Sequence, residues 1–595
     1  MYICTVHDPS SLKAQPQHPL GSGARVLLTS VFGPYAQDDE YGSRVINPME
    51  LFHNQITRVH GPFSIRIFHR SWGLMLIQAN IDAPCTVLDF PTLDRFVEEI
   101  RDNHYDIVGI SSIVMNFHKV KKMCELIREH LPNATIVVGG HVANMEKLDS
   151  LIDADYIVRG EGVRWFRRFL GQDENKPIRH PLIKGGVKQR TMGLKLREGF
   201  CPRALTLIPG VGCPLGCNFC CTSAMFGGKG KFVNFYETGD ELFDIMCHLE
   251  REMKVHTFFV MDENFLLHRS RALRLLELMQ KNEKFWSLYV FASANALKLY
   301  TMEQLVSLGI SLVWIGLEGR NSQYDKNKGI DTRSLVRELQ SHGIWVIGST
   351  IIGLEEHTPD NIDEAIDYAI SHGADFHQFM LYMPMPGTPL YNEFSAKGVL
   401  MDSGEIDIAD WHGQYRFNYR HPHIKPGDET EFLLRAFQRD LEVNGPSALR
   451  ILRRTLTGWL RHKKHPERRI RERFARTITG MATIYAGAVW AGRRWFRNNS
   501  SVAPRLTALL KEIYSEFGLK ARIAAPLIGR CFLFWLRRED KRLANGWTIE
   551  PPTFYETNYE KTNPTTKAKR VAGRIRWVLP APPPERKAVE EQRAA

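Results

Sequence analysis

Three cysteines share the nine-residue stretch Gly212-Cys213-Pro214-Leu215-Gly216-Cys217-Asn218-Phe219-Cys220, with the spacing C-x3-C-x2-C. A structural zinc site usually takes four ligands from C-x2-C or Cys/His pairs, which close a tetrahedron. Three thiolates on one tight loop instead suit three irons of a 4Fe–4S cluster and leave the fourth iron open. An open iron can bind a small molecule. The spacing therefore predicts that Cys213, Cys217 and Cys220 are metal ligands at a site of catalysis.

This loop resembles the signature of the radical S-adenosylmethionine (radical SAM) superfamily, in which an aromatic residue precedes the last cysteine, as Phe219 does here. The resemblance implies that SAM chelates the open iron through its amino and carboxylate groups. One electron from the cluster then gives methionine and a 5'-deoxyadenosyl radical, which abstracts hydrogen from an unactivated carbon. The protein orients these cofactors and excludes water. A flavodoxin or ferredoxin is the expected electron donor. Cys221 lies outside the spacing and is interpreted as a bystander.

Six apolar segments alternate with helical patterns around and after the cysteines, which predicts a partial (β/α)6 barrel over residues 201–395. Reactive groups of parallel barrels lie at the carboxyl ends of their strands, so the polar residues that follow each segment are the candidates. The expected strands are Ala204–Pro209, His256–Met261, Tyr289–Ala294, Leu312–Leu317, Trp345–Ile352 and Phe376–Met383.

The resemblance implies a role for several of these strand ends. Asp262 and Glu263 match the place where relatives hold the amino group of SAM, for which acidic side chains are suited. Ser293 and Glu318 match positions near the SAM carboxylate and ribose, and Ile352 ends the adenine-contacting strand. Taken singly, each of them has an ordinary structural explanation, such as an ion pair or a helix cap. Because they occur in order at successive strand ends after the cysteine loop, a role in binding SAM is the favoured explanation.

Residues 24–175 predict a doubly wound parallel sheet, because short apolar strands alternate with helices. Ligands of such sheets bind at the strand carboxyl ends. Ser111 and Ser112 end one strand, and Gly139 and Gly140 end the next. The five expected strands are Ala24–Val31, Cys85–Phe90, Asp106–Ser112, Ala134–Gly140 and Asp155–Val158.

This arrangement resembles the cobalamin-binding domain of one radical SAM branch. The segments that match are Trp72-Gly73-Leu74, Gly109–Ser112, Gly139-Gly140 and Gly160-Glu161-Gly162. That branch also shares the P-x-P-G-T-P pattern found at 384–389. No D-x-H-x-x-G motif follows the first strand, so cobalamin is expected base-off with an open lower face. His141 is a candidate cobalt ligand, although an ordinary loop histidine is the favoured interpretation. The alternative for the whole domain is a Rossmann-like fold that binds no cofactor.

A long insertion, rich in His, Arg and aromatic residues, runs from Phe32 to Ser71. Long ordered insertions are often functional, which suggests the hypothesis that this one covers the cobalamin or the substrate.

The 595 residues carry a net charge of +12, and 43% of them are hydrophobic, which is enough for several cores. Residues 451–550 hold 22 Lys and Arg against 7 Asp and Glu, so the basic excess belongs to the C-terminal part. Apart from the central group, the ten cysteines show no ligand spacing and no disulfide framework. The N-terminus lacks the pattern of a secretory signal. We therefore expect a cytoplasmic location, free or at the inner face of the membrane.

The C-terminal part mixes arginines with bulky apolar residues, as in Arg493-Arg494-Trp495-Phe496, and is expected to be helical. The apolar stretch Ile478–Gly492 is too short to cross a bilayer. Basic and aromatic helix faces suit a membrane surface, so peripheral membrane contact through 451–550 is one hypothesis. A solvated charged face is the ordinary alternative. RNA binding is disfavoured because no RNA-binding module is evident.

The predicted organisation is α/β: a Rossmann-like cobalamin-binding domain, a partial radical SAM barrel and a mostly helical, basic extension. The predicted function is C-methylation of a lipid-like or other large apolar substrate, with a 4Fe–4S cluster, SAM and cobalamin. Radical cyclisation, coupling or oxidation without methyl transfer is the first alternative, and a sensor without turnover the second. The predicted boundaries are a tail 1–23, the domain 24–175, a linker 176–200, the barrel 201–395, the extension 396–561 and a disordered tail 562–595.

Overall fold

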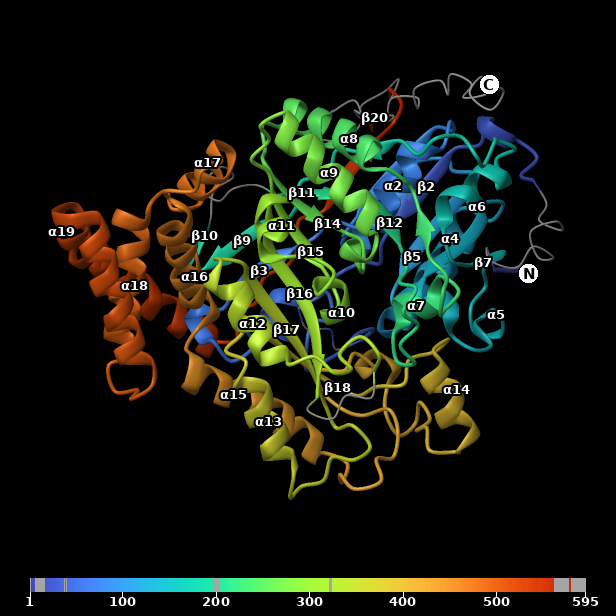
Figure 1. Cartoon of the computed structure of the whole chain (residues 1–595). Coiled ribbons are helices and arrows are strands. Elements are labelled where there is room, and N and C mark those ends of the chain that lie inside the picture. Colours follow the sequence, from blue (N-terminus) through green and yellow to red (C-terminus); the bar gives the residue numbers. More distant parts are fainter. Residues whose placement is uncertain are drawn as a thin grey trace, which may run out of the picture.

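The computed structural model describes residues 2–5, 17–36, 38, 40–195, 204–319, 324–560 and 577–578. Three parts lie in a row in Figure 1: the N-terminal sheet with its helices at the right, the barrel in the centre, and helices α16 to α19 at the left. The predicted disordered tail 562–595 lies outside the described residues except for β20 (Trp577–Val578), which pairs with β8 (His180–Pro181).

The N-terminal sheet is doubly wound, as predicted. Helices α2 (Trp72–Asn80) and α6 (Gly162–Phe169) cover one face, and α3 (Leu93–Asp102) and α4 (Phe117–His130) cover the other. All strands but the last are parallel. Their spatial order is β1 (Tyr2–Thr5), β7 (Tyr156–Arg159), β6 (Thr135–Gly140), β5 (Ile107–Ser112), β2 (Val26–Thr29), β4 (Cys85–Asp89) and β19 (Phe554–Thr557).

Both edge strands of this sheet were missed by the sequence prediction. Tyr2–Thr5, placed in a tail, pairs in parallel with β7, and Phe554–Thr557, placed in the helical extension, pairs antiparallel with β4. An edge strand is recruited through backbone groups that any residue carries, so a four-residue segment gives little pattern to read. The sheet therefore draws strands from both predicted flanking regions.

The barrel sheet contains the six predicted strands, in chain order and all parallel. They are β11 (Ala204–Leu207), β14 (Thr257–Val260), β15 (Ser287–Phe291), β16 (Ile310–Glu318), β17 (Trp345–Ile352) and β18 (Phe376–Leu381). The outer helices are α8 (Gly239–Met253), α9 (Arg269–Lys281), α10 (Ala294–Leu297), α11 (Met302–Ser307), α12 (Thr332–Ser341) and α13 (Ile362–Ile370). Thr238 and Glu241 form a capping box that fixes the start of α8. The strand order ends at β11 and β18, so the barrel is open.

The insertion Phe32–Ser71 packs inside the barrel. Its π-helix η2 (Phe52–Ile56) contacts β18, and Ile56 lies in one apolar cluster with Leu312 and Ile347. These strand residues belong to the face that the outer helices leave free. The insertion ends in β3 (Arg66–Phe68), which forms a separate sheet with β9 (Val187–Thr191) and β10 (Leu194–Lys195). The hypothesis that it covers cobalamin or substrate stays untested.

The C-terminal part is mostly helical, with α15 (Asp428–Asn444), α16 (Ser447–His462), α17 (Arg468–Thr477), η8 (Met481–Tyr485), α18 (Ala486–Trp495) and α19 (Val502–Ala544). Gly518 has non-helical torsions and divides α19 into two helices. Within the described ranges, no helix is both long and apolar enough to cross a membrane. The remaining elements are η1 (Gly21–Gly23), η3 (Gly61–Phe63), η4 (Val114–Asn116), η5 (His141–Asn144), α5 (Leu148–Leu151), β12 (Gly210–Val211), α7 (Cys221–Met225), β13 (Val233–Asn234), η6 (Phe265–Leu267), α14 (Pro389–Ala396) and η7 (Ile408–Asp410).

Candidate functional site

The cysteine loop lies between β12 and α7 and wraps tightly. Gly216 has φ of 66°, and a Cβ there would lie 2.5 Å from Cβ of Lys229, so glycine is required. The Ser223 hydroxyl donates to the carbonyl of Cys213 at 2.8 Å, and the Cys220 amide donates to the carbonyl of Cys217 at 3.0 Å. These bonds hold the three predicted ligands in one turn.

The three thiols form one electrostatic group. Burial raises the pKa of Cys213 to about 11, and the neighbouring thiols of Cys220 and Cys217 add to the rise. All three are free and half-buried. In the described part of the chain no three His, Cys, Asp or Glu side chains gather closely enough to hold a single ion. In a cluster each thiolate binds a different iron, so the sulfurs lie farther apart. The donor set therefore fits a 4Fe–4S cluster.

Lys326 supplies a positive charge beside this group, and sequence reasoning did not find it. Its ammonium pairs with the Glu318 carboxylate and lies 5.5 Å from the ring centre of Phe219. Burial opposes the ammonium, but Glu318 and Cys217 outweigh it and raise the pKa of Lys326. In return, Lys326 counteracts the burial that raises the pKa of Cys217 and Cys220. This lysine therefore favours the thiolate forms that bind iron.

The structure separates the two acidic residues predicted to hold the SAM amino group. Asp262 is buried and pairs with Arg271, from Oδ2 to Nη2 at 2.5 Å, so its carboxylate already has a cation. Glu263 is also withdrawn from solvent, but its Oε2 has no hydrogen-bond partner among the described residues. Burial, with a smaller contribution from Asp262, raises the pKa of Glu263 to about 7. A carboxylate oxygen that is buried without a hydrogen-bond partner costs free energy until a donor arrives. Glu263 is therefore the better candidate to accept a hydrogen bond from the SAM amino group.

The other strand ends differ in what they offer a ligand. Ser293 is buried, and its hydroxyl accepts from the side-chain amide of Asn264 at 2.9 Å. Glu318 has φ of 58°, a left-handed conformation that is costly for a residue with a Cβ and that concentrates at functional sites. The side chain of Ile352 is fully buried in an apolar cluster, so only its backbone remains for the predicted adenine contact. These roles in SAM binding remain predictions.

Small residues form the carboxyl edge of the N-terminal sheet. Ser111 pairs in register with Gly139, and Ser112 with Gly140. A Cβ on Gly139 would meet only the carbonyl of Val158, at 3.8 Å, so the space in front of it is open. A Cβ on Gly140 would lie 2.4 Å from the carbonyl of Ser112. The edge is a shallow cradle of backbone and hydroxyl groups, which fits the close approach of a large planar cofactor.

His141 and Glu161 also lie at this edge, with different surroundings. His141 begins η5, and its Nδ1 has no hydrogen-bond partner in the part of the chain that the structure describes. Burial lowers its pKa, so the neutral imidazole is favoured. Glu161 is buried and caps α6 by accepting from the amides of Val163 and Arg164. Glu161 is thus structural, and cobalt ligation by His141 stays an open alternative.

The two carboxyl edges face each other. Helix α7, which follows the cysteines directly, contacts η5, which follows Gly140 directly. The P-x-P-G-T-P segment and the residue that follows it contact both sides: a Cβ on Gly387 would lie 2.9 Å from Cβ of Asn144, and the Leu390 amide donates to the carbonyl of Asn218 at 3.0 Å. Met383 belongs to the apolar core of the N-terminal sheet. The cysteine loop and the glycine cradle therefore belong to one site.

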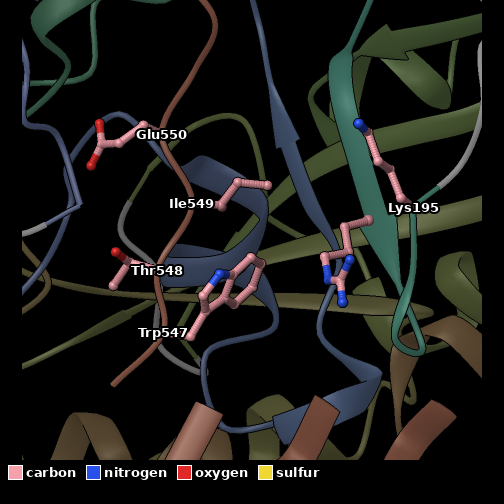
Figure 2. Close-up of a pocket in the computed structure, with 6 residues that line it drawn as sticks. Lys195, Trp547, Thr548, Ile549 and Glu550 are labelled. Atoms are coloured by element: carbon pink, nitrogen blue, oxygen red, sulfur yellow. The ribbon is translucent and has the colours of Figure 1, made fainter. Parts of the chain in front are cut away.

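A separate cavity of about 240 Å³ contains none of the predicted site residues (Figure 2). Arg190 there pairs with Glu539 and lies 5.0 Å from the ring centre of Trp547, while Glu550 accepts from the amides of Tyr35 and Ala36, each at 2.8 Å. The charged side chains of Arg190 and Glu550 are therefore occupied in fixing α19 and the segment after it to the rest of the fold. We interpret the cavity as a structural contact region. Its lining is Arg190, Lys195, Trp547, Thr548, Ile549 and Glu550.

Two family models match the chain: the B12 binding domain over residues 73–170 and the radical SAM superfamily over residues 207–369. Among its relatives is bacteriochlorophyllide d C-8(2)-methyltransferase of Chlorobaculum tepidum, 24% identical over 402 residues, covering 62% of this chain and 83% of that one. The anaerobic magnesium-protoporphyrin IX monomethyl ester cyclase of Cereibacter sphaeroides is 21% identical over 387 residues, with coverages of 57% and 59%. Hopanoid C-2 methylase of Rhodopseudomonas palustris is 26% identical over 210 residues, with coverages of 33% and 39%.

A barrel with the cysteine triplet at its carboxyl edge, matched by the superfamily model, is that of a radical SAM enzyme. More narrowly, the chain belongs to the branch of the superfamily in which a B12-binding domain precedes the radical SAM domain. Its cofactors are a 4Fe–4S cluster, SAM and cobalamin. The resemblance read from the sequence is confirmed, and the Rossmann-like domain without a cofactor is excluded.

Proposed function

We propose that this enzyme transfers a methyl group from SAM to an unactivated carbon of a large apolar substrate. The contact between α7 and η5 is the observation that carries the proposal, because it sets the cluster loop against the cobalamin cradle. A methyl group carried at one edge can then reach a carbon activated at the other. Two of the relatives described above are named as methylating enzymes, which supports this reaction.

Different residues of the chain bind the three cofactors. Cys213, Cys217 and Cys220 hold the cluster, Glu263 accepts from the SAM amino group, and the glycine cradle receives cobalamin. When bound, these groups supply electron transfer, a carbon radical and the methyl group. The protein keeps the reacting atoms in a dry and fixed geometry. A flavodoxin or ferredoxin is the proposed electron donor.

The inward face of the barrel supports a large apolar substrate. Phe259, Phe291 and Trp314 are partly exposed there, with ring centres 5.7 Å and 5.1 Å apart along the row. Such a row offers apolar area with only one indole N–H, which already donates to Ser349 at 2.7 Å. The relatives are named for tetrapyrroles and hopanoids, which are also large and largely apolar.

Radical chemistry without methyl transfer is the second candidate, because a cyclase stands among the relatives. One assay separates the two. The protein is reconstituted anaerobically with iron, sulfide and cobalamin and supplied with SAM, a reductant and an extract of host lipids and pigments. 5'-Deoxyadenosine and S-adenosylhomocysteine are then quantified together, with Cys217→Ala as the blank.

Methyl transfer predicts both products in similar amounts, each dependent on the extract. Extract-dependent 5'-deoxyadenosine alone would contradict methyl transfer and favour the second candidate. If an enzyme with a verified cluster formed neither product, the sensor alternative would replace both.

A further inference from the structure

The second half of α19, after the break at Gly518, exposes an apolar stripe. Leu519, Ile523, Leu527 and Phe534 are 71%, 54%, 57% and 60% exposed. Their separations of four, four and seven residues place them on one face of the helix. The opposite face carries Ala521, Ala525, Gly529, Phe532 and Leu536, which are buried in the C-terminal core. The fold thus uses one face of this helix and leaves an apolar one uncovered in the described structure.

Cations flank this stripe, and acidic residues are absent from it. Residues 517–538 contain Lys520, Arg522, Arg530, Arg537 and Arg538 but no Asp or Glu. Across the described ranges, none of these five side chains forms an ion pair.

The basic residues of α16 behave differently. Arg450 pairs with Asp440, Arg453 with Glu512 and Arg454 with Asp375. The excess of positive charge in the C-terminal part therefore has two uses. In α16 it joins helices to the barrel and to each other. In residues 517–538 it stays unpaired around exposed apolar side chains.

We propose that the exposed face of residues 519–538 docks on a bilayer that contains anionic phospholipids. Leucine, isoleucine and phenylalanine side chains enter the boundary between headgroups and acyl chains, while arginines contact the phosphates. A nucleic acid would satisfy the charges but would leave the apolar stripe in water, whereas an anionic bilayer supplies phosphates for the arginines and hydrocarbon for the stripe, which is why we commit to a membrane. Helix α19 lies at the left of Figure 1, on the other side of the barrel from the N-terminal sheet. The inference does not depend on the proposed methyl transfer.

The test is co-sedimentation of the full chain with vesicles of phosphatidylcholine alone or mixed with phosphatidylglycerol. The expected result is binding to the anionic vesicles only, weakened by added salt. Arg537→Gln with Arg538→Gln should lower the partition coefficient by about tenfold or more, since each basic residue contributes about 1 kcal/mol. Leu527→Ser with Phe534→Ser should lower it by a similar factor.

Controls come from other surfaces of the chain: Lys281→Gln with Lys298→Gln removes two charges as the arginine pair does, and Leu151→Ser with Leu299→Ser replaces two leucines that are 42% and 47% exposed. Unchanged thermal unfolding shows that each variant is folded. The exposed Cys531 lies beside the stripe, and an environment-sensitive dye attached there should shift to the blue on anionic vesicles, a shift that Cys531→Ser removes.

Three results would overturn the proposal. They are no binding to anionic vesicles, binding that the stripe variants leave unchanged, and binding lost by the arginine pair alone. The last result would show that the chain adsorbs through charge alone, without insertion of the stripe, as a surface for an acidic protein or a nucleic acid would.

Discussion

The two facing edges of this enzyme present different chemistry to their ligands. The barrel edge offers thiols and charged side chains withdrawn from solvent, such as Glu263 and Lys326. The edge of the N-terminal sheet offers Ser111, Gly139 and Gly140, with little beyond backbone and hydroxyl groups. A charged ligand such as SAM is held by opposite charge, which is strong where water is excluded. A large planar cofactor is held by shape. Substitutions at the first edge should therefore act through charge, and those at the second through volume.

The largest effect is expected at the cluster ligands. Cys217→Ala leaves two of three ligands, so iron content and SAM cleavage should be lost, whereas cobalamin content should stay as in the wild type. Iron and cobalt analysis with a 5'-deoxyadenosine assay measures all three. Cys221→Ala is the matched control. Cys221 lies outside the spacing, and burial raises its thiol pKa to about 12, so this variant should keep its cluster. If Cys221→Ala lost iron and Cys217→Ala kept it, the ligand assignment would be wrong.

Substitutions of the adjacent residues Asp262 and Glu263 should have different effects, one on the stability of the fold and the other on SAM binding. Glu263→Gln should weaken SAM binding by about tenfold to a hundredfold without lowering the unfolding temperature, because the charge that is removed has one buried oxygen, Oε2, without a hydrogen-bond partner among the described residues. Asp262→Asn should lower the free energy of unfolding by about 3 kcal/mol, since Arg271 is left buried without a counter-charge. Calorimetric titration and thermal unfolding measure the two quantities. Equal losses of affinity in both variants would contradict the division of roles.

The same carboxylate predicts a pH dependence. In the free protein the pKa of Glu263 is raised to about 7, and its charged form is the better acceptor for the SAM amino group. SAM affinity should therefore rise as the pH rises through about 7, with release of a proton. Without SAM, this group destabilises the fold as the pH rises from about 4.5 to about 7, because the folded state then holds the proton more tightly. Titrations of Glu263→Gln in buffers of different ionisation enthalpy should show no such proton release.

At the cobalamin edge the expected effect is smaller and depends on volume. Gly139→Ala places a methyl group where the protein itself leaves room, so the unfolding temperature should not fall. Cobalamin affinity should drop by about tenfold, because the methyl group occupies space next to the cofactor. Absorbance titration with cobalamin measures it. Gly23→Ala, which also has open space around the new Cβ, is the control and should bind as the wild type does. Unaltered affinity in Gly139→Ala would place cobalamin elsewhere.

The smallest effect concerns Lys326. Lys326→Gln removes a positive charge near Cys217 and Cys220, so the reduced cluster should be disfavoured and its potential should fall by tens of mV, an order of magnitude set by local charge. The double variant Lys326→Gln/Glu318→Gln should recover most of the shift. Redox titration followed by EPR measures the potential, with the exposed Lys328→Gln as the control. A potential unchanged in the single variant would remove this lysine from the site.

The strands and the cluster ligands were predictable because their signals are local. An apolar run such as Trp345–Ile352 defines a strand by itself, and the ligand spacing of the cysteines lies within one loop. The two edge strands β1 and β19 were missed because they join the sheet through backbone groups. Nothing within either four-residue segment indicates its partner.

Tertiary contacts decided the rest of the candidate site. Asp262 and Glu263 are alike in the sequence, and only Arg271, nine positions after Asp262, distinguishes them. Lys326 lies in a loop whose sequence has no recognisable motif. Its role is apparent only from its ion pair with Glu318 and its proximity to the cysteines. The interior place of the insertion Phe32–Ser71 depends on which strand faces the outer helices leave uncovered.

The claim that both edges share one site is tested most directly by the magnetic interaction between the two metals. EPR spectra are recorded on protein that holds a reduced cluster and cob(II)alamin together, and on samples that hold one of them. The facing of α7 and η5 predicts that the doubly loaded sample shows broadened, coupled signals and faster relaxation of the cobalt spin. A spectrum equal to the sum of the two single spectra would contradict the account.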